Sequence, residues 1–165
     1  MQKKRIGLFT IIILLLFILS CSTNVPFTKS VIKDYKLSSE DIEHLQFYLS
    51  DYLILEREIE DIDKTLTKSH SLKKVKDKFI DQIIIKKGTP CIVTKISNDT
   101  LYVAFEPNEN LIFCSTLKNN NLFSLQLNKK LNSKRHFNIQ GEDGTIEVAL
   151  NGEVLYQNNI YQVFT

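Results

Sequence analysis

Three histidines, His44, His70 and His136, are the side chains of this sequence best suited to metal binding or acid–base chemistry. A metal site needs several ligands that converge, usually with one pair at helical or hairpin spacing. The three histidines are widely separated, and none has a Cys or carboxylate partner in a recognised metal-binding pattern. We therefore predict that all three are surface residues, with no metal site and no cofactor.

Candidate nucleophiles lack the partners that would activate them. Ser-x-x-Lys occurs, for example, at residues 30–33 and 71–74. In penicillin-binding proteins this motif acts together with SDN and KTG motifs, which are missing from this sequence. Neither internal cysteine has an identifiable base, and the chain contains no HExxH motif and no phosphate-binding glycine loop. We predict a protein that is not an enzyme, and a hydrolase with dispersed catalytic residues is the least favoured alternative.

Cys21 stands where an apolar segment ends and a polar one begins. Residues 1–5 carry three positive charges, and residues 6–19 are apolar apart from one Gly and one Thr. This run is shorter than the about 20 residues of a membrane span and has the layout of a signal peptide. The segment ILSC (residues 18–21) resembles the lipobox of bacterial lipoproteins, with Ser20 as the small residue before the acceptor cysteine.

This resemblance implies that Cys21 receives a diacylglyceryl thioether and becomes the first residue after cleavage. The acyl chains, palmitate among them, would hold the protein on a membrane, because each buried methylene contributes about 0.8 kcal/mol. Ser22 follows the cysteine where Asp would favour the inner membrane, so we expect an outer-membrane anchor with the domain facing the periplasm. An ordinary signal peptide with an incidental cysteine, or an uncleaved anchor, remains the alternative.

Composition limits the partners and the number of domains. Residues 1–20 hold three of the 21 basic side chains and no acidic one, which leaves 18 basic against 19 acidic side chains. The mature chain therefore has no basic excess for nucleic acid. We predict a lipoprotein signal peptide over residues 1–20, a lipid-anchored tether over 21–37 and a single β-rich globular domain over 38–165.

The hydrophobic pattern of the mature chain predicts one helix followed by short strands. Ser38 or Ser39 can cap an amphipathic helix that carries Ile42, Leu45 and Leu49 on one face. Asn98-Asp99, PNEN, Asn151-Gly152 and Asn158-Asn159 are predicted turns between apolar runs. The strands are expected among the runs DYLILERE, FIDQIIIKK, CIVTKI, TLYVAFE, LIFCS, NLFSLQL, HFNI, TIEVAL, EVLYQ and IYQVF. The fold class is mainly β: a small antiparallel barrel or sandwich of about seven or eight strands with one N-terminal amphipathic helix.

Cys91 and Cys114 would lie in an oxidising compartment, so a disulfide between them has to be considered. If Asn98-Asp99 form a two-residue loop and PNEN connects the next pair of strands, Val103 lies opposite Cys114 and Cys91 points to the other face of the sheet. A three-residue first loop would reverse that conclusion. We favour two unbridged cysteines that fill the core.

Charge is unevenly distributed along the chain. Residues 40–63 carry nine acidic side chains and one Arg, whereas residues 64–87 carry eight Lys and two Asp. We expect the two segments to be neighbours that neutralise each other, and a docking surface for a charged partner is the alternative. A second basic cluster, in a predicted loop, is a candidate contact for an envelope partner, although a solvated loop is the simpler interpretation. This cluster consists of Lys129, Lys130, Lys134 and Arg135.

Two further resemblances bear on function. IIIKKGTPCIVTKI, LYVAFE and LIF together resemble small β-rich lipoproteins of Bacteroidetes type that have no assigned activity. Asp99-Thr100-Leu101 resembles the O-glycosylation signal of periplasmic proteins from the same bacteria, which makes Thr100 a candidate modification site. We predict a non-enzymatic envelope protein that binds or scaffolds a protein partner, for example in a secretion assembly. A module that binds a small molecule, a glycan or an enzyme to be inhibited is the alternative.

Overall fold

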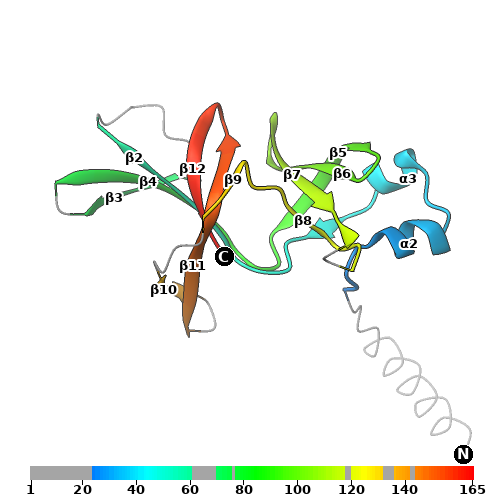
Figure 1. The fold of residues 1–165 in the computed structure, drawn as a ribbon, viewed down its shortest axis with the longest axis horizontal. Coiled ribbons are helices and arrows are strands. Elements are labelled where there is room, and N and C mark those ends of the chain that lie inside the picture. Colours follow the sequence, from blue (N-terminus) through cyan, green and yellow to red (C-terminus); the bar gives the residue numbers. More distant parts are fainter. Residues whose placement is uncertain (1–23, 61–69, 76, 118–119, 132–135, 142–143) are drawn as a thin grey trace, which may run out of the picture.

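The computed structural model describes residues 24–60, 70–75, 77–117, 120–131, 136–141 and 144–165, with only the backbone described over 136–141 and at 144 (Figure 1). The predicted signal peptide and Cys21 lie outside these ranges. None of the helices within them combines the length and the hydropathy that a bilayer span requires.

The fold is mainly β, as predicted, and consists of two antiparallel sheets. A five-stranded sheet has the order β1-β5-β6-β7-β8, and a seven-stranded sheet has the order β10-β11-β12-β2-β4-β3 with β9 paired to β11. The strands are β1 Phe47–Tyr48, β2 Leu53–Ile59, β3 His70–Val75, β4 Lys78–Ile85, β5 Pro90–Ser97, β6 Thr100–Glu106, β7 Glu109–Ser115, β8 Phe123–Leu125, β9 Lys129–Lys130, β10 His136–Gly141, β11 Gly144–Tyr156 and β12 Asn159–Phe164.

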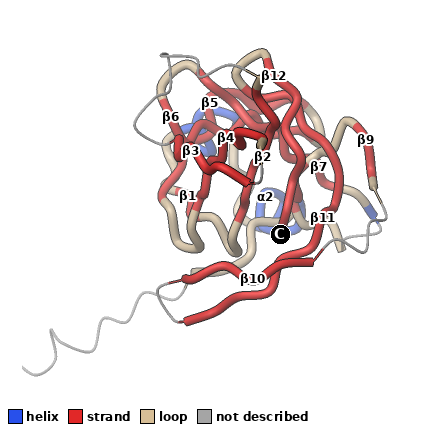
Figure 2. Tube along the Cα trace, turned by 90° about the vertical axis from the view of Figure 1, so that its left-hand side faces the viewer, coloured by secondary structure: helices blue, strands red, loops and turns tan. Residues whose placement is uncertain are grey.

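The chain passes between the two sheets three times, after β1, after β4 and after β8. Figure 1 shows the five-stranded sheet and the helices at one end of the molecule and the β2-β4-β3 ribbon at the other. The tube view of Figure 2 shows the β10–β11 hairpin extending away from the remaining strands. The last strand, β12, lies inside the seven-stranded sheet between β11 and β2, and its Tyr161, Val163 and Phe164 are fully buried.

The largest cluster of buried residues joins the two sheets. Leu55 and Ile83 come from neighbouring strands of the seven-stranded sheet, and Leu111 comes from β7 of the other sheet. Tyr161 and Val163 of β12 complete the centre of this cluster and are fully buried. Alternate residues of β2, β4 and β12 thus form one apolar face that covers part of the five-stranded sheet.

The helical region differs from the prediction. The described residues contain two short helices, α2 Lys29–Asp34 and α3 Ser39–Glu43, and the chain is already extended at β1. Ser38 caps α3, since its Oγ accepts a hydrogen bond from the Asp41 N–H at 3.1 Å while Asp41 Oδ2 accepts one from the Ser38 N–H at 2.8 Å. Helix α2 lies within the segment predicted as a tether, and Ile32 packs against the core of the five-stranded sheet.

The β5–β6 hairpin confirms the predicted two-residue loop. Ile96 lies opposite Leu101, which leaves Asn98-Asp99 as the loop. A bulge in β5 then shifts the register, so Ile92 lies opposite Ala104, whereas a hairpin without a bulge would pair Ile92 with Phe105.

The β6–β7 hairpin has a tighter turn than the predicted PNEN loop. Glu106 lies opposite Glu109, so the turn consists of Pro107-Asn108, and Asn108 has a φ of 66°. Cys114 consequently lies opposite Thr100 and not opposite Val103. Both internal cysteines are free, as favoured by the sequence, because they lie on β5 and β7 with β6 between them. Cys91 is a core residue, as predicted, whereas the core position expected for Cys114 is wrong, since Cys114 is only partly buried.

The predicted turn at Asn151-Gly152 is wrong, because β11 runs through both residues with a register shift between Leu150 and Gly152. Gly152 is opposite Lys130 of β9. A Cβ at Gly152 would lie 2.2 Å from the backbone oxygen of Lys129, so glycine is needed here for the close approach of β9. The following turn consists of Gln157-Asn158, with φ values of 49° and 58°, one residue before the predicted position.

Candidate functional site: a buried network around Asp81 and the adjoining groove

Asp81 is a carboxylate at the centre of β4 with no exposed surface. It shares strand parity with the buried Ile83 and Ile85, so its side chain lies on the same face as the main core. In the sheet it is opposite Arg57 of β2 on one side and Leu72 of β3 on the other. A buried charge of this kind requires partners, and the neighbouring strands supply them.

Three side chains from three different strands bond to the Asp81 carboxylate. Arg57 Nε donates to Oδ2 at 2.8 Å, and the Tyr161 hydroxyl donates to the same oxygen at 2.8 Å. His70 Nδ1 lies 2.6 Å from Oδ1, and the His70 side chain is only 3% exposed. The Arg57 guanidinium also lies 5.4 Å from the centre of the Tyr161 ring, within the range of a cation–π contact.

Electrostatics favour the ionised form of Asp81. Burial alone would raise the pKa of this carboxyl, but the hydrogen bonds from Arg57, Tyr161 and His70 hold the pKa below its ordinary value. Burial raises the pKa of the Tyr161 hydroxyl, and the Asp81 carboxylate that it bonds raises it further. The site therefore contains a carboxylate, a neutral phenol and a guanidinium.

The network continues through His70 to the other sheet. His70 Nε2 lies 3.0 Å from Gln157 Oε1, in the β11–β12 turn. Gln157 Nε2 donates to Glu106 Oε2 of β6 at 3.3 Å. Asn159 completes the network, since its Oδ1 accepts from Arg57 Nη1 at 2.6 Å. We call this set of seven residues the Asp81 network: Arg57, His70, Asp81, Glu106, Gln157, Asn159 and Tyr161.

Glu106 also borders a groove of about 280 Å³ between the sheets. Its walls are mainly apolar, with one basic and one acidic side chain. The lining residues are Ile83, Ile84, Ile85, Lys86, Thr89, Phe105, Glu106 and Tyr156. Burial, together with the nearby carboxylates of Glu106 and Glu109, raises the pKa of the Tyr156 hydroxyl to about 12. Small-molecule sites have this mixture of apolar walls and few polar groups.

The chemistry open to the Asp81 network is limited by its own bonds. Both ring nitrogens of His70 and both oxygens of Asp81 already have partners within the protein. No Ser, Thr or Cys contacts His70 in the bonds described above, so a nucleophile–base pair is not formed there. Among the described residues there is no group of three or more His, Cys, Asp or Glu side chains that could hold a metal ion. The network is suited to fixing the relative positions of β12, β2, β4 and β3, which are neighbours in the seven-stranded sheet beside the groove.

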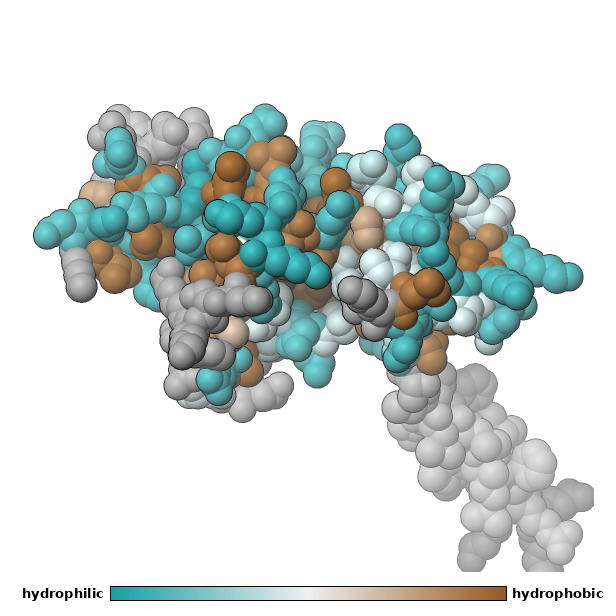
Figure 3. All heavy atoms as spheres, in the orientation of Figure 1, coloured by the Kyte–Doolittle hydropathy of each residue, from teal (hydrophilic) through white to brown (hydrophobic). Residues whose placement is uncertain are grey.

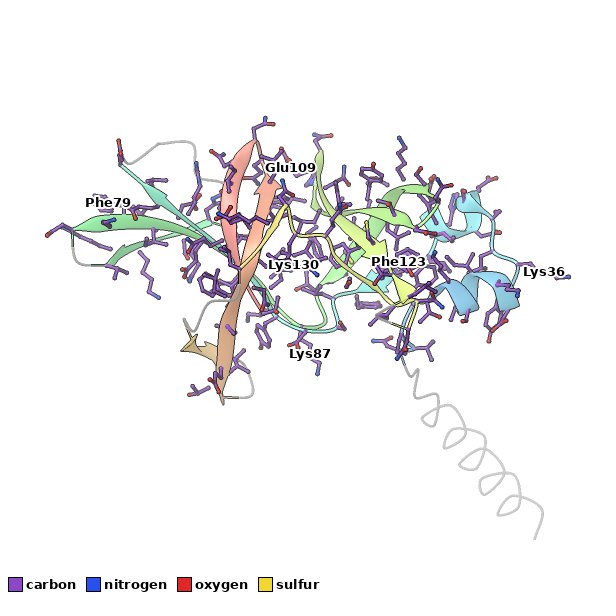
Figure 4. The ribbon with its side chains drawn as sticks, in the orientation of Figure 1. Lys36, Phe79, Lys87, Glu109, Phe123 and Lys130 are labelled. Carbon is purple, nitrogen blue, oxygen red and sulfur yellow. The ribbon has the colours of Figure 1, made fainter. Side chains whose placement is uncertain are left out.

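The predicted site residues are not brought together with this network. Lys134 and Arg135 of the basic cluster, like Cys21, lie outside the described residues. Lys129 and Lys130 form the exposed strand β9, where Lys129 Nζ is 3.8 Å from Glu153 Oε1 (Figure 4). An exposed ion pair of this length contributes little to stability and says nothing about a binding partner. The partner contact at Lys129 and Lys130 therefore stays a prediction.

Thr100, the candidate glycosylation site, is the first residue of β6 and is half-buried. Its Oγ1 lies 3.4 Å from Cys114 Sγ, so the hydroxyl faces a neighbouring strand. Asp99, which precedes it, forms an ion pair with Lys29. Glycosylation of Thr100 stays a prediction.

The prediction of a surface position is confirmed for His44, which is exposed with its Nδ1 2.7 Å from the Glu40 carbonyl oxygen. It is wrong for His70, which is buried because Asp81 and Gln157 supply partners for both its ring nitrogens. The side chain of His136 is outside the described set. Lys78 Nζ lies 2.7 Å from Glu58 Oε1, which is an instance of the predicted neutralisation between the acidic and basic segments within the part of the chain that the structure describes.

One sequence signal could have located the network. FIDQIII contains a single Asp at a position whose strand neighbours, two and four residues later, are apolar core positions. A charge on the buried face of a strand indicates a paired site. Its partners Arg57, His70 and Tyr161 are separated by up to 80 residues from it, and no local pattern identifies them.

Comparison of the chain with known protein families, with curated proteins and with solved structures found no match in any of the three.

Proposed function

We propose that this protein is a lipid-anchored component of a bacterial envelope, attached through Cys21 to the outer membrane and facing the periplasm, with a binding or scaffolding role and no catalysis. The observation that carries this proposal is the ILSC segment, which ends three residues before the first described residue, Asn24. A lipidated cysteine so close to the folded domain would keep the domain at the membrane surface.

Two features support a binding role without catalysis: the groove, and the Asp81 network, whose polar atoms are bonded to one another within the protein. The groove offers apolar walls with Lys86 and Glu106 at its border, which suits a protein side chain or peptide as an occupant. The network places His70 and Asp81 behind it with their polar atoms bonded internally, which supports a structural role for these residues. A protein partner from the envelope, for example a member of a secretion assembly, is the occupant that we favour.

A second candidate function is the binding of a small molecule or glycan. The mainly apolar walls with few polar groups favour it, and the volume of about 280 Å³ is just below the roughly 300 Å³ at which ligand-binding pockets begin. An enzyme to be inhibited would use the same groove as a partner protein. A protein partner and a small molecule or glycan differ in the mass that crosslinking would add to this protein at the groove.

Site-specific photo-crosslinking in cells separates the alternatives. A photoreactive amino acid replaces Lys86 at the groove or, as the matched control, the exposed Lys95 of β5. We expect a discrete adduct with one envelope protein at position 86 and none at position 95. Adducts at neither position, or equally at both, would contradict a protein-binding groove, and a mass increase of only a few hundred daltons at position 86 would support the small-molecule alternative.

A further inference from the structure

The three most exposed large hydrophobic side chains among the described residues lie at one end of the molecule. They are Leu117, Val25 and Tyr35, with exposed fractions of 88%, 78% and 75%. The next in exposure, Ile160 at 65%, belongs to β12 of the other sheet. Single exposed apolar residues are normal on proteins, but three at one place indicate a contact surface. Elsewhere, Figure 3 shows hydrophobic residues on the visible face as separate patches between hydrophilic ones.

Backbone contacts hold this end together. The Lys29 N–H donates to the Asn121 carbonyl at 3.2 Å, and Thr28 forms an isolated β-bridge with Leu122. The Asn121 N–H donates in turn to the Thr116 carbonyl at 3.2 Å, which closes the turn that carries Leu117. The start of α2 and the β7–β8 turn are therefore neighbours.

The same end is firmly attached to the core of the five-stranded sheet. The Phe27 ring lies edge-on to Phe47 at 4.9 Å between ring centres and stacks on Phe123 at 5.6 Å. Ile32 and Leu37, on either side of Tyr35, pack against the same core. Val25, Tyr35 and Leu117 thus project from an ordered surface.

The covalent chain limits how far this surface can lie from the lipid. Val25 is the fourth residue after Cys21, and a fully extended chain spans at most about 3.6 Å per residue, or about 14 Å over these four steps. The headgroup layer adds roughly 5–8 Å on each side of the hydrocarbon core. If Cys21 is acylated, Val25 can reach the headgroups.

The side chains of α2 itself fit a lipid surface. Along α2 and its C-cap, Lys33 and Lys36 are exposed beside Tyr35, against one exposed acid, Asp34, while Lys29 is paired with Asp99. The acidic side chains of the neighbouring α3, Glu40, Asp41 and Glu43, are exposed as well, so a contact with anionic headgroups requires them to lie away from the bilayer. Tyrosine is enriched at the membrane–water interface, and lysine is attracted to anionic headgroups. Figure 4 shows Lys36 at the end of the molecule opposite Phe79 of the β2-β4-β3 ribbon.

We propose that Val25, Tyr35, Leu117 and the adjacent Lys33 and Lys36 form a membrane-contact surface that enters the headgroup layer of the bilayer holding the acyl chains of Cys21. This inference rests on the proposed lipid anchor and adds an orientation to it. The domain lies with α2 on the membrane, and the β2-β4-β3 ribbon points away from it.

The absence of tryptophan from the chain permits a direct test. Single reporters are introduced by Tyr35→Trp at the contact surface and, as the aromatic-for-aromatic control, Phe79→Trp at the distant ribbon. Each lipidated full-length variant is placed in liposomes of phosphatidylethanolamine and phosphatidylglycerol, with or without brominated acyl chains. We expect the Tyr35→Trp variant to lose roughly half of its fluorescence emission to the brominated lipid. This variant should also emit at shorter wavelength in liposomes than in detergent-free buffer with urea. The emission of the Phe79→Trp control should be unaffected by bromine.

Equal quenching of the two variants, or none in the Tyr35→Trp variant, would overturn the contact surface. Leu117→Trp provides a second reporter with the same expected result, so the test does not depend on one variant folding. The mass of the purified protein separates this failure from failure of the anchor. With acyl chains on Cys21 and no quenching, only the contact surface is wrong, whereas an unacylated Cys21 overturns both proposals.

Discussion

Replacing Asp81 by Asn changes the charge of the Asp81 network without changing the size of the side chain. Oδ2 accepts from Arg57 and Tyr161, and Oδ1 lies next to His70 Nδ1. If the amide NH₂ takes the place of Oδ2, it faces the donors Arg57 and Tyr161; if it takes the place of Oδ1, it faces His70 Nδ1, which accepts only in the neutral tautomer protonated on Nε2. In either orientation the Arg57 guanidinium loses the negative charge with which it is paired.

The cost follows from burial. Removing one partner of a buried ion pair destabilises proteins by about 3–5 kcal/mol. The Arg57 side chain keeps 22% of its surface exposed, so part of its charge stays hydrated and the lower end of that range applies. We expect Asp81→Asn to lower the free energy of unfolding by about 3 kcal/mol, and the melting temperature by about 6–12 °C for a domain of this size.

Urea unfolding followed by circular dichroism measures this loss, with Asp34→Asn at an exposed position of α2 as the matched control. The control should remain within about 0.5 kcal/mol of the wild type. An Asp81→Asn variant that also stays within that range would refute the argument that this network holds the strands together.

The same variant has a defined pH dependence. Folding lowers the pKa of Asp81, so its contribution to stability is complete above the unfolded pKa of about 3.9 and is lost as the pH falls through the lower folded value. The stability difference between wild type and Asp81→Asn should be largest near neutral pH and shrink below about pH 4. A difference that is unchanged at pH 3 would contradict an ionised Asp81.

Three other results are expected. Gly152→Ala should lower the free energy of unfolding in urea by about 1–3 kcal/mol, because its Cβ would lie 2.2 Å from the Lys129 backbone oxygen; unaltered stability would contradict the close approach of β9. Iodoacetamide at pH 8 should modify Cys91 only after unfolding, since burial raises the pKa of its thiol to about 11, and fast labelling of the folded protein would disprove this. Tyr156→Phe should leave the phenol absorbance titration unaltered below about pH 11, because the pKa of Tyr156 is raised to about 12. A missing ionisation near pH 10 would show that the hydroxyl is exposed.

Strands were predictable wherever alternation and turn residues agreed. FIDQIIIKK, CIVTKI and TLYVAFE correspond to β4, β5 and β6, and Asn98-Asp99 form the expected loop. These hairpins depend on local signals, namely a period of two and a residue that tolerates a left-handed conformation. Local signals are sufficient when the partner strand is the next one in the sequence.

The same signals failed where a distant strand determines the backbone. Asn151-Gly152 is a strong hairpin signal, yet Gly152 serves the crossing of β9 and the chain continues as one strand. The segment predicted as a tether, residues 21–37, has no clear hydrophobic period, but within it Phe27 and Ile32 gain their partners from β1, β8 and the core of the five-stranded sheet. In both cases tertiary contacts override local preference.

The candidate site is the part of the structure that could least be predicted from the sequence. His70 lies in a polar stretch, and only its contact with Asp81 across β3–β4 shows that it is buried. Tyr161 is 80 residues from Asp81 in sequence. A pairing of this kind follows from strand order, and strand order is not encoded in any short segment.

The most direct test of the account is the mass spectrum of the N-terminal peptide of the protein extracted from its membrane. We predict a chain that begins at Cys21 and carries a diacylglyceryl group on its sulfur, with further mass if the amino group is also acylated. An unmodified Cys21, or a mature chain that begins at another residue, would contradict the lipid anchor and the membrane orientation that depends on it.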